Sequence, residues 1–365
     1  MSRALRDRVK TRRFAKALEI LEGAEGRVFT AAALHVRIGG EVACEAPFGV
    51  LLPGGPRVRS DTAFDLASIT KVFAGTALLA LFDERRFALD DPIVSILPEF
   101  AGPDPRRTSV TFAHLLTHTS GLPAHVSFRD EVAAPAVIAR VCATPLTSAP
   151  GACVVYSDLG FMLVGEAIRR LSDVPLASAV ADLVLEPLGI ANAGYCPPPE
   201  ERPRIACTER DSWRGRLLQG EVHDENCWSM GGVSAHAGLF APASAVADLG
   251  EAYRNGGTAG ERRIVSRHAA SLATRERAHS ADERRGLGWA LKTSGRQSCG
   301  TRFGPGSFGH TGYTGTSLWV DPDRALTVAL LTNRVYFTRD PSPIFELRAA
   351  VHDALVEALD IAAAG

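Results

Sequence analysis

The chain has 365 residues, a formal net charge of −1 and a pI of about 6.8, with 46% hydrophobic and 22% charged residues. This composition is that of an ordinary globular protein and gives no electrostatic reason to expect binding to nucleic acid or to an anionic membrane. The length exceeds that of one small domain, so we expect either two lobes or one large body with an insertion.

The cysteines and the N-terminal segment indicate the compartment. An odd number of scattered cysteines in a long chain favours free thiols in a reducing environment. The first 26 residues mix acidic and basic side chains without the apolar core of a secretory signal, and no apolar run is long enough to span a membrane. We therefore expect a cytoplasmic protein, with its oligomeric state left open. The seven cysteines are Cys44, Cys142, Cys153, Cys196, Cys207, Cys227 and Cys299.

The N-terminal part of the chain predicts a helix and then a β-hairpin. Residues 3–22 have apolar side chains at helical spacing. Residues 27–46 contain two β-forming runs on either side of Gly39 and Gly40. Because glycine adopts positive φ without strain, this pair suits a two-residue turn. A polar loop over residues 53–61 then leads to the first buried helix.

Beyond residue 82 the pattern is mainly helical, and strand patterns return only near the C-terminus. Residues 160–171 predict an amphipathic helix, residues 316–320 and 325–332 two strands, and residues 345–359 a closing helix. We therefore expect an α+β fold with one antiparallel sheet flanked by helices and an all-α lobe inserted. The expected parts are an α/β domain formed by residues 1–82 and 225–365, and the helical lobe formed by residues 83–224.

A helix that begins at Ser68 is apolar nearly all round as far as Phe82, which is typical of a helix buried in a large core. Ser68 and Lys71 do not fit such a helix. They are three positions apart, so both side chains emerge on one face within contact distance. Burial lowers the pKa of a lysine, and a neutral amine beside a serine hydroxyl is a general base beside a nucleophile. We therefore expect Lys71 to be uncharged.

A purely structural explanation of these two residues is also open, because Ser68 can cap the helix and Lys71 can extend its amine to solvent. The lysine content favours the chemical interpretation. Arginine stays protonated in proteins and could not act as a base, and this chain uses arginine almost everywhere. Of its 40 Lys and Arg residues, the lysines are Lys10, Lys16, Lys71 and Lys292.

Two further segments carry residues suited to the same chemistry. Tyr156 and Asp158 lie in a short turn before a helix, where a packing tyrosine and a helix cap are the simpler interpretation. Residues 308–315 form a strand start punctuated by glycines, which allows close approach to the backbone. Neither segment is specific by itself.

Together, these motifs resemble those of the serine β-lactamase and penicillin-binding-protein superfamily. The chain is most similar to the class C β-lactamase-like serine hydrolases, which include esterases, D-aminopeptidases and DD-peptidases. The similarity runs from about residue 27 to residue 355 and is most evident over residues 114–122, 222–240 and 309–320. In chain order the motifs are Ser-x-x-Lys at Ser68 and Lys71, Tyr-x-Asp at Tyr156 and Asp158, and His-Thr-Gly at residues 310–312.

The resemblance implies a catalytic role for four residues. Ser68 would attack a carbonyl carbon and form an acyl-enzyme, while Lys71 would accept its proton. Tyr156 would relay protons to the leaving group and from water. The backbone N–H groups of Ser68 and Tyr313 would hold the oxyanion.

The resemblance also implies that Asp158, His310, Thr311 and Gly312 contact the substrate. His310 replaces the lysine of the usual Lys-Thr-Gly, so we expect a weaker, pH-dependent anchor for a substrate carboxylate. Asp158 replaces the usual asparagine and can only accept hydrogen bonds when it is ionised. We therefore expect an ester or a small amide as substrate rather than efficient β-lactam hydrolysis.

A metal site is the competing explanation for His114 and His118, which are four residues apart. No glutamate follows His114 as in a zinc-protease motif, and the tract resembles a structural segment of the family. We expect no metal and no cofactor.

Three functional interpretations remain open. The first is a serine hydrolase that acts on a small-molecule ester or amide. The second is a DD-peptidase of the penicillin-binding type or a β-lactamase, which the missing signal segment and His310 disfavour. The third is a non-catalytic scaffold with the same fold, which the intact set of Ser68, Lys71 and Tyr156 disfavours.

Overall fold

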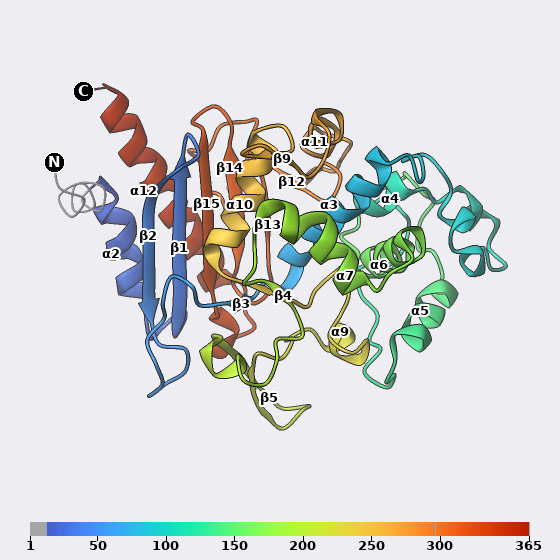
Figure 1. Cartoon of the computed structure of the whole chain (residues 1–365), viewed down its shortest axis with the longest axis horizontal. Helices are drawn as coiled ribbons and strands as arrows, with labels where there is room; N and C mark the ends of the chain where they lie inside the picture. The colour runs from blue at the N-terminus through green and yellow to red at the C-terminus, as the bar shows by residue number, and fades with distance from the viewer. Residues whose placement is uncertain (1–12, 296, 365) are drawn as a thin grey trace.

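The computed structural model describes residues 13–295 and 297–364. Its centre is an eight-stranded antiparallel sheet with the strand order β10-β11-β12-β13-β14-β15-β1-β2 (Figure 1). Both ends of the chain contribute strands, which confirms the expected sheet. The strands are β1 (Ala31–Ile38), β2 (Glu41–Gly49), β10 (Ala278–His279), β11 (Arg284–Arg285), β12 (Ala290–Leu291), β13 (Phe308–Thr311), β14 (Ser317–Asp321) and β15 (Leu326–Thr332).

The predicted hairpin and the two predicted late strands are present. Between β1 and β2, Gly39 and Gly40 have φ angles of 60° and 89°, as the tight turn requires. β15 pairs with β1 in an antiparallel register that includes Leu34↔Leu330. This pairing joins the N-terminal and C-terminal pieces into one sheet.

Helices cover both faces of the sheet. From β1, Leu34 and Val36 pack in the cluster that contains α2 (Ala15–Ala24) and α12 (Ser342–Ala364). Ala33 points to the opposite face and packs in the cluster that contains α10 (Ala243–Arg254). Side chains therefore alternate between the two faces, as the strand period requires. The predicted closing helix is confirmed; of the predicted opening helix, the part before residue 13 lies outside the described residues.

Within residues 83–224, the range predicted as a helical lobe, most helices lie beside the sheet, at the right of Figure 1. Residues 83–224 are not all helical, because they also contain β4 (Gly194–Tyr195), β5 (Cys207–Asp211) and β6 (Arg216–Gln219). β4 pairs with β7 (Leu239–Ala241), which in turn pairs with β3 (Phe64–Asp65). Strands of two or three residues are too short to show an alternation of apolar and polar side chains, so the sequence did not predict them. The lobe's helices are α4 (Phe112–Leu116), α5 (Ala134–Ala143), α6 (Asp158–Ser172), α7 (Leu176–Val180) and α8 (Glu186–Leu188).

The other short elements precede α10 or lie between α10 and β10 in the chain. They are α9 (Glu225–Ser229), β8 (Thr258–Ala259), β9 (Arg262–Arg263) and α11 (Arg267–Ala273).

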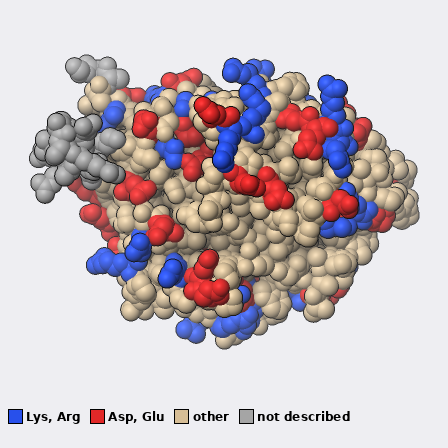
Figure 2. Space-filling model, in the orientation of Figure 1, with Lys and Arg blue, Asp and Glu red and all other residues tan. Residues whose placement is uncertain are grey.

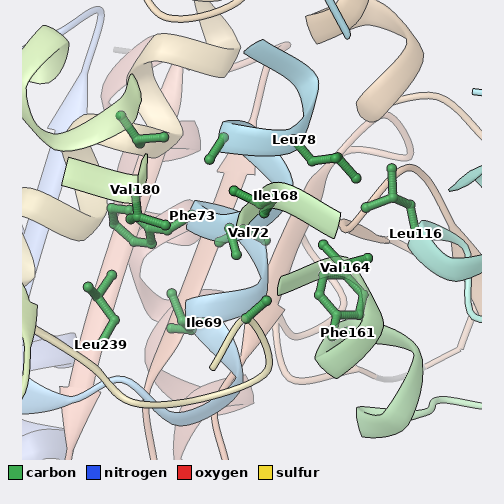
Figure 3. Packing of buried hydrophobic residues seen from close by; sticks show 14 of the residues in the cluster. Ile69, Val72, Phe73, Leu78, Leu116, Phe161, Val164, Ile168, Val180 and Leu239 are labelled. Atoms are coloured by element: carbon green, nitrogen blue, oxygen red, sulfur yellow. The ribbon is translucent and has the colours of Figure 1, made fainter. Parts of the chain in front are cut away.

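The helix α3 (Thr70–Asp83) lies at the junction of the lobe and the sheet, and it is buried from Thr70 to Leu81. Apolar side chains from α6 and α7, such as Phe161 and Val180, surround its own Val72 and Phe73 (Figure 3). This confirms the prediction of a helix buried all round.

The outer surface carries both signs of charge. Figure 2 shows acidic and basic side chains interspersed over the face in view. In the part of the chain that the structure describes, no helix is both long enough and apolar enough to cross a membrane.

Candidate active site

Ser68 lies in a 3₁₀ turn, Ala67–Ile69, directly before α3. Ala67 has a φ of 47°, a left-handed conformation that is uncommon for a residue other than glycine and that is often found at functional turns. The buried Asp65 supports the turn, because its Oδ1 accepts a hydrogen bond from the Ala67 N–H at 2.8 Å. The turn places Ser68 at the edge of a cavity.

Lys71 lies on the first turn of α3, and its side chain is completely buried. Its Nζ donates to Ser68 Oγ at 2.9 Å, to Asp158 Oδ1 at 2.7 Å and to the His236 carbonyl at 3.2 Å. The structure therefore brings Ser68 and Lys71 together, as their spacing predicted. It also places Asp158, which we expected to contact the substrate, against Lys71.

The expectation that Lys71 is uncharged is wrong. Burial by itself lowers the pKa of this amine, but the attraction of Asp158 and Tyr156 outweighs burial and holds the pKa above its usual value of 10.5. Lys71 is therefore an ammonium group at neutral pH. The sequence could not show this, because Asp158 is 87 positions away along the chain.

Tyr156 lies beside this ion pair and is half-buried. The centroid of its ring is 4.7 Å from Lys71 Nζ, 4.5 Å from the centroid of the His118 ring and 5.1 Å from the guanidinium carbon of Arg285. His118 also fixes the backbone on both sides of Tyr156. Its carbonyl accepts from the Val155 N–H at 2.8 Å, and its Nδ1 accepts from the Ser157 N–H at 3.0 Å.

The spacing of His114 and His118 is explained by structure. His114 Nδ1 accepts from the Thr111 N–H at 3.2 Å, which completes the cap of α4. His118 is occupied with the Tyr156 segment, and burial holds its pKa well below 6.5. The described residues contain no group of three or more metal-ligating side chains that could hold an ion.

The strand residues of the third motif lie at the end of β13, where His310 is buried. We expected a weaker, pH-dependent anchor for a carboxylate at this position, and the expected pH dependence near neutral pH is wrong. Burial, together with the nearby Arg285 and Lys71, holds the pKa of His310 well below 6.5, so the ring is neutral at physiological pH. Its Nδ1 lies 2.9 Å from the Thr311 carbonyl, while its Nε2 has no partner among the described residues.

Six of the eight predicted site residues line one cavity of about 590 Å³, a volume suited to a small-molecule ligand. Lys71 is buried beneath it, and Asp158, with a side chain 20% exposed, holds Lys71 in place. The structure therefore gathers all three motifs around one space. The six lining residues are Ser68, Tyr156, His310, Thr311, Gly312 and Tyr313.

Four arginines that no sequence motif singled out line the same cavity: Arg284, Arg285, Arg334 and Arg348. Arg285 is nearly buried and pairs with Glu283 at 2.9 Å. It lies on β11, a strand of two residues, and no local pattern distinguishes it from the many other arginines of this chain. Asp282 and Glu283 also line the cavity, so its four arginines outnumber its two carboxylates. The cavity therefore holds more cationic side chains than the replacement of a lysine by His310 suggested.

His236 and Asp224 hold in place the segment whose carbonyl accepts a hydrogen bond from Lys71. His236 Nε2 lies 2.8 Å from Asp224 Oδ1, and its Nδ1 lies 2.7 Å from Ser234 Oγ. Asp224 also caps α9 by accepting from the Cys227 N–H at 2.7 Å. These bonds orient the His236 segment whose carbonyl accepts from Lys71.

Comparison with known proteins identifies the family. The family model described as Beta-lactamase matches residues 13–353. The chain belongs to the β-lactamase family. It is a serine hydrolase with the antiparallel sheet and flanking helices of the β-lactamase/transpeptidase-like fold.

A curated relative and solved structures with different names are similar to this chain. A protein of Escherichia coli (strain K12) named "Putative D-alanyl-D-alanine carboxypeptidase" is 31% identical over 318 residues, which are 78% of this chain and 72% of that protein. The solved structure of EstCE1, a hydrolase with promiscuous acyltransferase activity, is similar with a TM-score of 0.77 and 20% identity, over 94% of this chain and 100% of EstCE1. A family VIII carboxylesterase is similar with a TM-score of 0.75 and 23% identity, over 95% of this chain and 97% of that structure.

Proposed function

We propose that this β-lactamase-family hydrolase cleaves an ester or a small amide through a covalent acyl group on Ser68. The observation that carries this proposal is the 2.9 Å contact between Ser68 Oγ, at the edge of the cavity, and the buried Lys71 Nζ. A hydroxyl in contact with an amine that is shielded from water is an activated nucleophile once the amine is deprotonated.

In the acylation step, Ser68 Oγ forms a bond to the substrate carbonyl carbon and transfers its proton to Lys71. The negative charge that develops on the carbonyl oxygen is stabilised by the N–H groups of Ser68 and Tyr313. Tyr156 passes a proton to the leaving alcohol or amine as its bond to carbon breaks. A water molecule then attacks the acyl carbon, and the same groups return the proton to Ser68 Oγ.

The charge of Lys71 sets the pH dependence of this step. Lys71 must lose its proton before it can accept one from Ser68, and its raised pKa makes that form a minority at neutral pH. Activity should therefore rise with pH until the protein begins to unfold.

A second candidate is a carboxypeptidase that acts on a peptide with a free terminal carboxylate. Arg285 favours it, because its buried guanidinium lies at the cavity next to the Tyr156 ring. A guanidinium binds a carboxylate through charge-assisted, bidentate hydrogen bonds. The Escherichia coli relative carries a name of this kind, "Putative D-alanyl-D-alanine carboxypeptidase".

A comparison of three substrate types tests the proposal. The parent protein and Ser68→Ala are assayed with nitrophenyl esters, with a peptide ending in D-alanyl-D-alanine, and with the β-lactam nitrocefin. We expect Ser68-dependent turnover of esters that is faster than that of nitrocefin. Faster turnover of the peptide would support the second candidate instead, and nitrocefin as the best substrate would contradict both. Equal activity of Ser68→Ala on every substrate would contradict the role of Ser68.

We also propose that the protein works in the cytoplasm on a small molecule, without a cofactor. All seven cysteines lie in the described part of the chain and are free. Burial raises the pKa of Cys44, Cys142 and Cys207 to about 11, which makes these thiols unreactive. Alkylation of the unfolded protein isolated from its native host, followed by mass measurement, should count seven thiols. A lower count would contradict a reducing compartment.

A further inference from the structure

Arg348 is a buried cation at the cavity whose position the proposed chemistry does not yet explain. It lies on α12, its exposed fraction is 6%, and it lines the cavity. Within the described residues it pairs with no carboxylate, although burying an unpaired charge is costly. Burial and the nearby Arg334 lower its pKa to about 9. Because burying an unpaired guanidinium is costly, we expect this side chain to have a specific structural or catalytic role.

The contacts of Arg348 are backbone carbonyls of the turn that follows β13. Its Nη2 donates to the Gly312 carbonyl at 3.0 Å and to the Thr316 carbonyl at 2.5 Å. Two backbone bonds close the same turn: the Gly312 N–H donates to the Thr316 carbonyl at 2.8 Å, and the Gly315 N–H donates to the Gly312 carbonyl at 3.1 Å. One guanidinium nitrogen thus joins the two carbonyls at the base of the turn.

This turn is packed directly on the segment that leads to Ser68. Thr314 Oγ1 donates to the Asp65 carbonyl at 2.7 Å, and Thr316 Oγ1 donates to the Leu66 carbonyl at 2.9 Å. A Cβ atom at Gly312 would lie 2.3 Å from the Leu66 carbonyl oxygen, so only glycine fits. The position of the turn relative to Ser68 is therefore tightly set.

The orientation of one peptide group in this turn matters for catalysis. In a planar trans peptide, the C=O of one residue and the N–H of the next point in opposite directions. Arg348 and Gly315 hold the Gly312 C=O, so they also determine where the Tyr313 N–H points. That N–H is one of the two donors assigned above to the oxyanion.

We infer that Arg348 is a positioning residue for the oxyanion hole, which it holds in shape by binding the Gly312 and Thr316 carbonyls. This inference rests on the proposed acyl-enzyme function. Without Arg348 the turn stays folded, but the Gly312 C=O is held only by the Gly315 N–H at 3.1 Å, between two glycines that allow the peptide to rotate. Its Tyr313 peptide then samples orientations that do not support the oxyanion.

The test uses Arg348→Ala together with a matched control, Arg107→Ala. Arg107 is also a buried arginine that binds backbone carbonyls, including that of Phe100 at 3.2 Å, but it lies in the helical lobe. Loss of one oxyanion donor lowers kcat by about 10²–10³-fold, so partial misplacement in Arg348→Ala should lower kcat about 10- to 100-fold with little change in KM. Arg107→Ala should lower the melting temperature and leave kcat unchanged in the folded protein.

Two further readouts separate positioning from general damage to the fold. A boronic acid forms a tetrahedral adduct with a serine that places an oxygen in the oxyanion hole, so its affinity should fall by the same factor as kcat. Millimolar guanidinium or methylguanidinium can enter the cavity left in Arg348→Ala and should restore part of kcat, with no such effect in Arg107→Ala. Arg348→Lys, which retains the charge, should lie between the parent and Arg348→Ala.

The outcomes distinguish this inference from the proposed function. If the parent protein hydrolyses esters through Ser68, but Arg348→Ala retains full kcat and boronate affinity, the inference about Arg348 is wrong. It is equally wrong if the loss in Arg348→Ala appears only in KM or only in the melting temperature. If the parent itself shows no Ser68-dependent turnover, the proposed function has failed first.

Discussion

The Lys71 ammonium and the Asp158 carboxylate form an ion pair of 2.7 Å directly beneath the Ser68 hydroxyl. Lys71 is completely buried, and Asp158 is its charged partner from the first turn of α6. The superfamily pattern to which the chain is similar has an uncharged asparagine at this position. The pair therefore gives this hydrolase a lysine that is held protonated more strongly than the motif alone implies.

Asp158→Asn should move the pH dependence of activity to lower pH. Removal of the carboxylate removes the main attraction that raises the pKa of Lys71, so burial then lowers that pKa. Because Lys71 acts as a base only when deprotonated, the rising limb of kcat/KM against pH should shift down by about one to three units, the usual effect of one opposite charge in contact. Activity at neutral pH should increase if the variant keeps its fold.

The control for this prediction is Glu166→Gln, which removes a carboxylate from the same helix. Glu166 pairs with Arg169 and Arg170, each at 2.8 Å, and takes no part in the site. Its pH profile should match that of the parent. If the rising limb of kcat/KM against pH stays in place or moves to higher pH in Asp158→Asn, Lys71 is not the titrating base.

His310 should not titrate in the pH range where an ordinary histidine does. Its pKa is lowered by burial and by two nearby cations, so the neutral ring persists as the pH falls through 6.5. The ratio of KM for an anionic ester to KM for a neutral ester should therefore be flat from about pH 5.5 to pH 8. An inflection near pH 6.5 that disappears in His310→Asn would refute the neutral assignment.

Arg285 should control the preference for substrates that carry a carboxylate. In Arg285→Gln, the KM of a carboxylate-bearing substrate should rise by about tenfold or more relative to a neutral ester, because a hydrogen bond to a charged group contributes about 1.5–3 kcal/mol. Arg169→Gln, on the surface of the helical lobe, serves as the control. An unchanged ratio in Arg285→Gln would remove the support for the carboxypeptidase candidate.

The features that the sequence predicted correctly are those with a strong local pattern. α3 was predicted because its apolar residues run on all sides, and Ser68 and Lys71 were identified because they interrupt that run. The hairpin at Gly39 and Gly40 was predicted for a similar reason, since glycine alone turns without strain. That the three motifs meet at one cavity was predicted only from their resemblance to those of a family, because no local pattern links them.

The features that were wrong or missed depend on contacts between distant segments. The charge of Lys71 is determined by Asp158, and the neutrality of His310 by burial beside Arg285. Arg348 contacts the turn of Gly312 from α12, and no spacing in the sequence reveals such a contact. The short strands of the lobe were missed because two-residue segments such as β4 show no period.

Labelling with a fluorophosphonate tests whether Ser68 is the nucleophile. The reagent phosphonylates activated serines, and the phosphonyl group then leaves the serine only slowly. The adduct is measured by intact mass and located by peptide mapping, in the parent protein and in Ser68→Ala. We expect one phosphonyl group per chain in the parent, located on Ser68, and none in Ser68→Ala. A parent protein that stays unlabelled, or a label on another residue that persists in Ser68→Ala, would contradict the assignment of Ser68 as the nucleophile.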